Sequence, residues 1–134
     1  MKNFFIILAL SFIFFVPNSF AKTIGEGELK LNDNIIRYFH QYLKGKGNKS
    51  PMMFVISVDG KYATYWYCPA GQCAGSSPSH FNKLCAIEAG VDCKVFARGR
   101  SIKWKNGINP GKGKASKISS KQSFSELKAR LTEL

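Results

Sequence analysis

The fold is decided by one stretch of the sequence, residues 51–68, which reads PMMFVISVDGKYATYWYC. Residues 52–58 and 61–68 are rich in β-branched and aromatic side chains, as strands are, and Asp59 and Gly60 lie between them. An Asp-Gly pair favours a two-residue type I′ turn, because both turn positions need a positive φ angle. The stretch therefore predicts an antiparallel β-hairpin.

The turn also sets the register of the hairpin, because each residue before Asp59 must face one residue after Gly60. On one strongly apolar face we expect the pairs Val58 with Lys61, Ile56 with Ala63, Phe54 with Tyr65, and Met52 with Tyr67. On the opposite face we expect Ser57 with Tyr62, Val55 with Thr64, and Met53 with Trp66. Cys68 shares this second face, so it is expected to lie close to the element that covers it.

Helices are predicted on both sides of the hairpin. Asn32 or Asp33 caps the first, which continues to about Lys44 and carries apolar residues at helical spacing, namely Ile35, Ile36, Phe39 and Leu43. The second begins at Ser77 or Ser79 and ends before Gly90. Its buried side is expected to hold Phe81, Leu84 and Cys85, with Ile87 beside Leu84.

The remaining elements complete a small α+β domain. Residues 93–97 alternate as a strand, the chain turns around Gly99, and residues 101–105 form a partner strand. Ser123 and Glu126 have the spacing of a capping box at the start of a last helix, which we expect to pack against the domain. The predicted fold is a disulfide-stapled ββαββ kernel, an antiparallel sheet with a packed helix, flanked by N- and C-terminal amphipathic helices.

The amino terminus has the three parts of a secretory signal. Lys2 precedes a stretch of thirteen residues, 4–16, that is apolar apart from Ser11, and small side chains at Ser19 and Ala21 follow. Thirteen helical residues cover about 20 Å, less than the roughly 30 Å hydrocarbon layer, so an uncleaved anchor is the alternative to cleavage after Ala21. The predicted parts are a signal peptide (1–21), an N-terminal helix and linker (22–50), the kernel (51–105), a basic flexible loop (106–122) and a C-terminal helix (123–134).

Cysteine usage agrees with export into an oxidising compartment. All four cysteines lie within 26 residues of one another, which is typical of a two-disulfide framework. Of the three connectivities we favour Cys68 with Cys73 and Cys85 with Cys93. A zinc site is the alternative, but the spacing fits none of the usual ligand patterns. We therefore predict a periplasmic or secreted protein with no metal and no cofactor.

Charge gives the strongest indication of function. The chain has 20 Lys and Arg residues against 8 Asp and Glu, and removing residues 1–21 leaves a net charge of +11 on 113 residues. Nine cations and no acid lie between residues 94 and 125. Aromatic residues interleaved with cations can stack on rings while the charges pair with anions. The predicted anion-binding patch consists of Arg98, Arg100, Lys103, Trp104 and Lys105; the alternative is that the cations are merely solvated and that Trp104 and Phe96 are core residues.

Catalytic interpretations are weaker. Cys73 with His80 could suggest a nucleophile and its base, but the expected disulfide consumes the thiol. The histidines are only two, and the carboxylates are scattered, so no metal cluster or hydrolase pair is predicted. The aromatic run Tyr62, Tyr65, Trp66 and Tyr67 could form a stacking platform, although alternate residues of a two-faced strand serve packing equally well. We predict no catalytic residue.

One resemblance follows from the order of these motifs. A hairpin ending in Cys68, a helix carrying Cys85, and Cys93 followed by Lys-Val-Phe-Ala, with Trp104 beyond, is similar to a module of small exported bacterial proteins of unknown function. The similarity covers about residues 53–104. It implies an exported hairpin-and-helix domain, and it implies no activity and no functional residue.

These observations predict a non-catalytic, exported binding or accessory protein of the cell envelope. Its partner is expected to be an anionic envelope component, such as anionic lipid or lipopolysaccharide, or a protein; nucleic acid is not expected in that compartment. A membrane surface stays open as a partner, and no transmembrane segment is expected after residue 21. The alternatives are a subunit of a larger envelope assembly that docks through the apolar stripes of its terminal helices, a Cys73-dependent enzyme, and a secreted effector.

Overall fold

The structure is a computed structural model that describes residues 22–69, 77–105 and 116–132. The predicted signal peptide, Cys73 and residues 106–115 of the predicted basic loop therefore lie outside the described residues. The elements in chain order are α1 (Asp33–Lys44), β1 (Pro51–Ser57), β2 (Ala63–Tyr67), α2 (Pro78–Ala89), β3 (Cys93–Arg98), β4 (Ser101–Ile102) and α3 (Phe124–Thr132). The predicted α+β class is confirmed.

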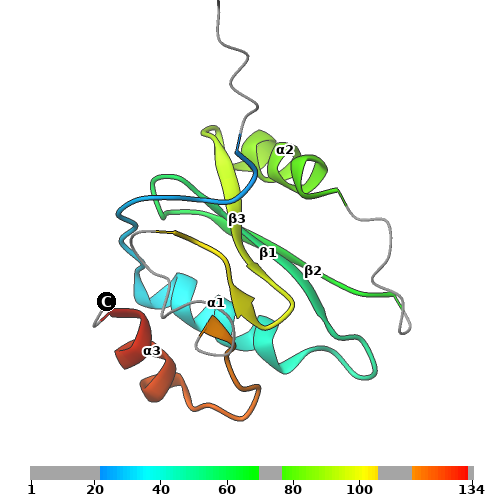
Figure 1. The fold of residues 1–134 in the computed structure, drawn as a ribbon, viewed down its shortest axis with the longest axis vertical. Helices are drawn as coiled ribbons and strands as arrows, with labels where there is room; N and C mark the ends of the chain where they lie inside the picture. The colour runs from blue at the N-terminus through cyan, green and yellow to red at the C-terminus, as the bar shows by residue number, and fades with distance from the viewer. Residues whose placement is uncertain (1–21, 70–76, 106–115, 133–134) are drawn as a thin grey trace, which may run out of the picture.

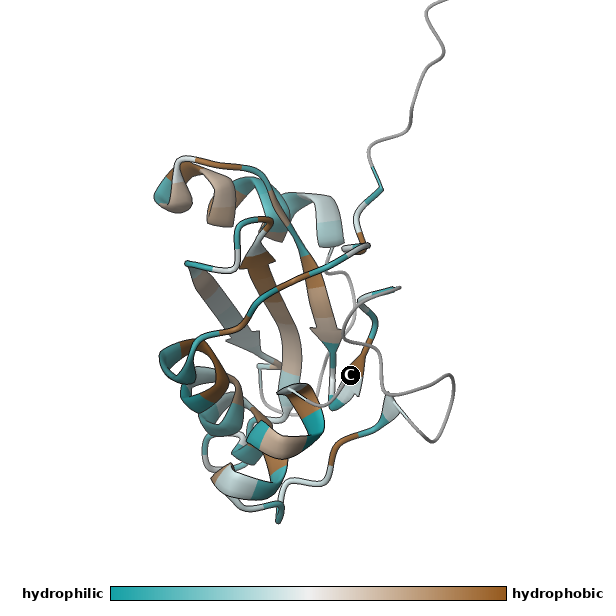
Figure 2. Cartoon of the chain, turned by 90° about the vertical axis from the view of Figure 1, so that its left-hand side faces the viewer, coloured by the Kyte–Doolittle hydropathy of each residue, from teal (hydrophilic) through white to brown (hydrophobic). Residues whose placement is uncertain are grey.

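The four strands form one antiparallel sheet in the order β2-β1-β3-β4, and helices cover both of its faces (Figure 1). Because successive side chains of a strand point to opposite faces, Phe54 and Ile56 of β1 pack with α1, whereas Met53 and Val55 pack with α2. Helix α3 lies against α1 and adds to the same side of the sheet. The central strands, covered on both faces, are the most hydrophobic (Figure 2).

Helix α1 begins and ends as the sequence predicts. The side chain of Asn32 caps it by accepting a hydrogen bond from the backbone N–H of Ile35 at 2.9 Å, and Lys44 is its last residue. The four apolar residues predicted to share one side of the helix are buried, and Tyr42 is buried with them. At the C-terminus Gly45, with a φ angle of 75°, donates its backbone N–H to the carbonyl of Tyr42.

The hairpin register is confirmed from Met53 to Ser57, and the predicted pairs of Met52 with Tyr67 and of Val58 with Lys61, at the two ends, are wrong. The predicted pairs of Met53, Phe54, Val55 and Ile56 with Trp66, Tyr65, Thr64 and Ala63 are all present. Tyr67, however, pairs with Pro51 and not with Met52, because a bulge interrupts β1 between Pro51 and Met53.

The turn of the hairpin is also wider than predicted. The turn hydrogen bond joins the N–H of Gly60 to the carbonyl of Ser57, and the backbone N–H of Ser57 bonds to Tyr62, so four residues separate the paired positions. The physical reason is the buried hydroxyl of Ser57, which donates to Asp59 at 2.6 Å and accepts from the N–H groups of Lys61 and Tyr62. These bonds replace those of a two-residue turn.

Helix α2 covers the other face of the sheet, but it is rotated from the predicted orientation. Phe81 and Cys85 are buried as expected, whereas Leu84 and Ile87 are 39% and 76% exposed and Asn82 is buried in their place. The disulfide between Cys85 and Cys93 is confirmed and ties the helix to β3. Cys68 is disulfide-bonded as well, and Cys73, its predicted partner, is not among the described residues.

Two further segments complete the α1 side of the sheet. The capping box is confirmed: Ser123 Oγ accepts from the N–H of Glu126, whose carboxylate accepts from the N–H of Ser123. Helix α3 then buries Leu127 and Leu131. Ile118, which the sequence analysis did not place in the core, is fully buried, and its N–H donates to the carbonyl of Arg100 at 2.7 Å.

The segment that precedes α1 lies along β3. Ile24 forms a parallel bridge with Val95, and Glu26 forms one with Lys105. Thr23 and Gly25 both bond to the backbone of Val95. The carbonyl of Thr23 accepts from the N–H of Val95, and the N–H of Gly25 donates to the carbonyl of Val95. Residues 23–27 thus extend the sheet beside β3.

Candidate anion-binding site

The predicted patch is divided between the two faces of β4 and its continuation. Side chains alternate along an extended chain, so residues 101 and 103 point to one side while residues 100, 102 and 104 point to the other. Arg98, Ser101 and Lys103 line one pocket of about 410 Å³. Ile102 and Trp104 are in the core on the α1 side, and Arg100 bonds to α1. Only part of the predicted set therefore lies together at a surface.

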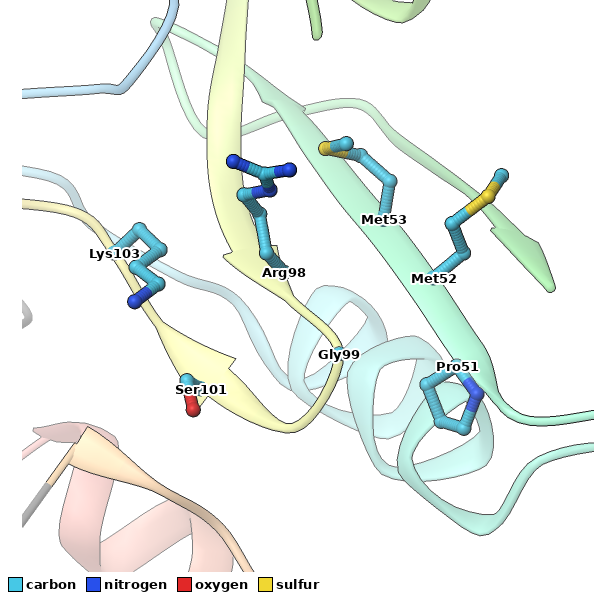
Figure 3. A pocket seen from close by; sticks show the side chains of 7 residues that line it. All are labelled: Pro51, Met52, Met53, Arg98, Gly99, Ser101 and Lys103. Carbon is cyan, nitrogen blue, oxygen red and sulfur yellow. The ribbon is translucent and has the colours of Figure 1, made fainter. Parts of the chain in front are cut away.

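The pocket containing Arg98 lies between β1 and the β3–β4 turn, on the side of the sheet that α2 covers only at its other end (Figure 1). Its apolar wall is formed by Pro51, Met52 and Met53, and its polar groups are Arg98, Ser101 and Lys103 (Figure 3). Arg98 is the cross-strand partner of Met53. We call this the Arg98 pocket; it combines two cations and a hydroxyl with thioether and proline surface.

The turn that carries Arg98 is held in place from two directions. Gly99 has a φ angle of 55°, a conformation that favours glycine, and its N–H donates to the carbonyl of Met52 at 2.9 Å. From the other side of the sheet, the hydroxyl of Tyr42 donates to the carbonyl of Gly99 at 2.7 Å. Burial raises the pKa of Tyr42 well above its ordinary value, so the phenol stays protonated and able to donate.

The side chain of Arg100 makes a hydrogen bond within the chain, to the end of α1. Its Nε donates to the carbonyl of Leu43 at 2.9 Å, in the last turn of α1, where a cation also interacts favourably with the helix dipole. It lines a second pocket, of about 610 Å³, together with Lys117, Ile118, Ser119 and Ser120. Arg100 therefore joins the turn to α1 and lies on the opposite side of β4 from the Arg98 pocket.

Trp104 is a core residue, which corrects the prediction that it stacks on a ligand. It is 2% exposed, its ring packs near Phe96, and its indole N–H donates to the carbonyl of Gly27 at 2.7 Å. Gly25 lies directly against the ring, since a Cβ there would overlap it. The alternative interpretation, in which Phe96 and Trp104 are core, is the one that the structure supports.

Lys105 is exposed, and its backbone is fixed by the N-terminal segment. Its N–H donates to the carbonyl of Gly25 at 3.0 Å, and its carbonyl accepts from the N–H of Gly27 at 2.8 Å. Lys105 does not line the Arg98 pocket. Of the five predicted residues, only Arg98 and Lys103 share a pocket.

The charges of the Arg98 pocket are not neutralised by a neighbouring carboxylate. In the described part of the chain the ion pairs are Lys22 with Glu26, Lys94 with Asp92, and Lys128 with Asp33. None of them includes Arg98 or Lys103, and none of the acidic residues that the structure describes lines the pocket. An anion that enters would therefore find two cations without displacing an internal partner.

The other candidate residues do not form a reactive site. Cys73 lies outside the described residues, and His80 is exposed on α2, beside the ring of Phe81. Within residues 22–69, 77–105 and 116–132 no group of three His, Cys, Asp or Glu side chains could hold a metal ion. In the same ranges no helix is long and apolar enough to cross a membrane.

The aromatic run of β2 is divided between the two faces of the sheet. Tyr65 and Tyr67 pack against Tyr42 of α1, with ring centroids 5.5 and 6.3 Å away, and Trp66 packs against Phe81 of α2 at 4.3 Å. Burial raises the pKa of Tyr65 to about 12. These rings are used mainly for packing.

The sequence analysis missed the apolar half of the Arg98 pocket. Pro51, Met52 and Met53 were assigned to the hairpin alone, yet they lie beside Arg98 because β1 pairs with β3 as well as with β2. The alternation of Ser101 and Lys103 with Ile102 and Trp104 was a usable signal for the polar half.

Comparisons with known proteins give no match: no protein-family model, no curated protein and no solved structure is similar enough to this chain. The resemblance to small exported proteins of unknown function stays a prediction. Function must therefore be argued from the geometry of the site.

Proposed function

We propose that this chain is an exported, non-catalytic accessory protein of the cell envelope that binds an anionic partner through the Arg98 pocket. We further propose that the ββαββ kernel of residues 51–105 is the binding unit and that α1 and α3 flank and support it. The observation that carries the proposal is that Arg98 and Lys103 line one pocket and that no acidic residue of the described ranges lines it with them.

The wall of the Arg98 pocket indicates the kind of anion. The half-buried Met52 lines the pocket together with the buried Pro51 and Met53, so the pocket that holds the two cations also has an apolar wall. A fully hydrated inorganic ion would make no use of that surface, whereas a phosphate attached to a hydrocarbon would place one part against each wall. A phosphate-bearing lipid of the envelope, either an anionic phospholipid or lipopolysaccharide, has this chemistry.

Binding to vesicles tests the proposal. Residues 22–134 should sediment with vesicles that contain phosphatidylglycerol and not with vesicles of phosphatidylcholine alone, and added salt should weaken the association. Arg98→Gln and Lys103→Gln should each weaken it about fivefold, since one cation near an anionic surface contributes about 1 kcal/mol.

Lys61→Gln is the matched control. It removes the same charge from an exposed position beyond the hairpin turn, at the end of β1 opposite the Arg98 pocket. If Lys61→Gln weakened binding as much as Lys103→Gln, the attraction would belong to net charge and not to the pocket. Binding that stayed unchanged in high salt would contradict the electrostatic mechanism altogether.

The assembly alternative loses its predicted interface. The apolar stripes of α1 and α3 are buried within the chain: Ile36, Phe39, Leu43, Leu127 and Leu131 are at most 3% exposed. Among the described residues the exposed large apolar side chains are Tyr38 on α1, Val58 after β1, and Leu84, Ile87 and Val91 on α2 and just after it. Of these five only the half-exposed Tyr38 lies on a terminal helix, so the anion-binding proposal is favoured.

The remaining alternatives are an enzyme and an effector. A Cys73-dependent enzyme would need a free thiol, and labelling of the native protein with a thiol reagent would test it directly. An effector would be released into the medium, which fractionation of a culture would detect. Neither alternative has a contact among the described residues in its favour.

A further inference from the structure

A second pocket lies at the beginning of the described chain, away from the Arg98 pocket. It has a volume of about 220 Å³, and Lys22, Ser79, Asn82 and Asp92 are among the residues that line it. It is formed where the segment before α1 passes between α2 and the start of β3. We call it the Asn82 pocket.

The chain is fixed immediately after Lys22. The carbonyl of Thr23 accepts two hydrogen bonds, from the N–H of Val95 at 2.8 Å and from the side-chain amide of Asn82 at 2.9 Å. The next residue, Ile24, forms a parallel bridge with Val95. Thr23 is thereby held between α2 and β3, and Lys22 is held at the pocket.

Asn82 presents an acceptor for which the described residues supply no donor. A carbonyl oxygen can only accept, so the contact with Thr23 requires the NH₂ group of Asn82 to face Thr23. The amide oxygen is then fixed as well. It is buried without a hydrogen-bond partner in the described part of the chain, on a side chain that is only 9% exposed. Such an acceptor is costly unless a donor reaches it.

The lysine side chains around the pocket are directed elsewhere. The ammonium group of Lys22 bonds to Glu26 at 2.9 Å, and that of Lys94 pairs with Asp92 at 3.2 Å. Lys83 is exposed. In this structure, therefore, no lysine side chain of the described residues supplies the donor that the Asn82 oxygen needs.

We propose that the Asn82 pocket is the binding site of the mature amino terminus, the α-ammonium group of Lys22, which is created by cleavage after Ala21. Before cleavage the nitrogen of Lys22 is a planar amide with one hydrogen. After cleavage it is a charged group with three donors at the same place in the fold, in the pocket that Asn82 and Asp92 also line. Cleavage of the predicted signal then completes the hydrogen bonding of α2, independently of what the Arg98 pocket binds.

The test compares two chains that differ only before residue 22. One begins at Lys22 with a free α-amine, released from a fusion partner by a protease that leaves no additional residue; the other carries Gly-Ser before Lys22. We expect the free form to melt at least about 4 °C higher, the shift expected for one added interaction of ordinary strength in a domain of this size.

Substitution of Asn82 shows whether this difference arises in the pocket. In Asn82→Leu the two chains should melt at the same temperature, and in Asp92→Asn, which removes a carboxylate from the same pocket and leaves the bond from Asn82 to Thr23 intact, the difference should shrink. Asn34→Leu, the same change as in Asn82→Leu at an exposed position of α1, is the control and should preserve the difference. If Asn82→Leu does not fold, Asp92→Asn alone decides.

Two results would overturn the proposal. Equal melting temperatures of the free and extended chains would show that the ammonium group makes no bond in the fold. A difference that persisted undiminished in Asn82→Leu and in Asp92→Asn would show that the extension acts elsewhere, by crowding the segment beside β3.

Discussion

The two faces of the sheet are built differently. Among the described residues, the face that α1 and α3 cover has a core of sixteen buried residues, in which Phe39 contacts Phe54 and Phe96 edge to face and Trp104 lies beside Phe96. The α2 face has six, and two of them, Cys85 and Cys93, form a disulfide. The thinner face also carries the Arg98 pocket, the Asn82 pocket and the exposed Leu84 and Ile87.

Because of this difference, most of the stability arises on one face of the sheet, and the proposed binding pocket lies on the other. Burial of apolar surface contributes most of the stability of a small domain, and here it is concentrated on the α1 side. The α2 side has fewer buried contacts and is held by a covalent bond, which leaves room for open pockets beside the helix. Elements that bind ligands are commonly drawn from the less stable part of a fold.

The largest expected effect contrasts one phenylalanine from each face. Phe39→Ala should lower the free energy of unfolding by about 3–5 kcal/mol, because Phe39 is 1% exposed and touches three other rings. Phe81→Ala on α2, where Phe81 is 8% exposed and packs on Trp66, should cost less. Urea denaturation measures both, and an equal or larger loss for Phe81→Ala would remove the contrast between the faces.

The disulfide of the thinner face gives the next effect. Replacing Cys85 and Cys93 together by Ser should lower the free energy of unfolding by about 2.6 kcal/mol, the chain-entropy value for a loop of about nine residues. Hydrogen exchange should then quicken at the amides of α2 and stay slow in α1. Equal acceleration in both helices would mean that the two faces unfold as one unit.

The smallest effect links the two faces. Tyr42→Phe removes the hydroxyl that crosses from α1 to the carbonyl of Gly99, and should cost about 0.5–1.5 kcal/mol at neutral pH. Tyr38→Phe, on a half-exposed ring of the same helix, is the control and should cost less. Both are measured by urea denaturation.

The pH dependence of this variant has a definite sign. The folded-state pKa of Tyr42 is raised above its ordinary value of 10.0, so its contribution is complete below pH 10 and is lost as the pH rises beyond it, when the unfolded chain ionises first. Tyr65, whose pKa is raised to about 12, acts in the same direction. Tyr42→Phe should therefore lose less stability than the parent chain between about pH 9 and pH 11. A parallel decline in both proteins would contradict the buried phenol.

Local patterns in the sequence were sufficient for much of the fold. Alternation in the hairpin gave its central register, and Asn32 with the apolar stripe of α1 gave both ends of that helix. The capping box of Ser123 and Glu126 was predicted from the sequence in the same way. In each case the residues that decide the structure are close together in the chain.

The sequence-based predictions were wrong where residues far apart in the chain determine the structure. Helix α2 has apolar side chains on both sides, so its orientation depends on the disulfide to Cys93 and on the bond from Asn82 to Thr23, which is 59 residues away. Trp104 looked like a binding residue among cations, yet Gly27, 77 residues earlier, supplies the carbonyl that accepts its indole N–H. The hydroxyl of Ser57 altered the turn through contacts that no propensity describes.

The bridges of Ile24 and Glu26 also determine when the sheet can be finished. Their partners, Val95 and Lys105, come 71 and 79 residues later in the chain. Contacts of such high sequence separation form slowly, because a long loop must close before they contribute. We therefore expect the edge beside β3 to close last, although its first strand is the first part of the domain to be synthesised. During synthesis the sheet would lack these two bridges, and the core around Trp104 would stay open until Gly25 packs against the indole ring and Gly27 accepts its N–H.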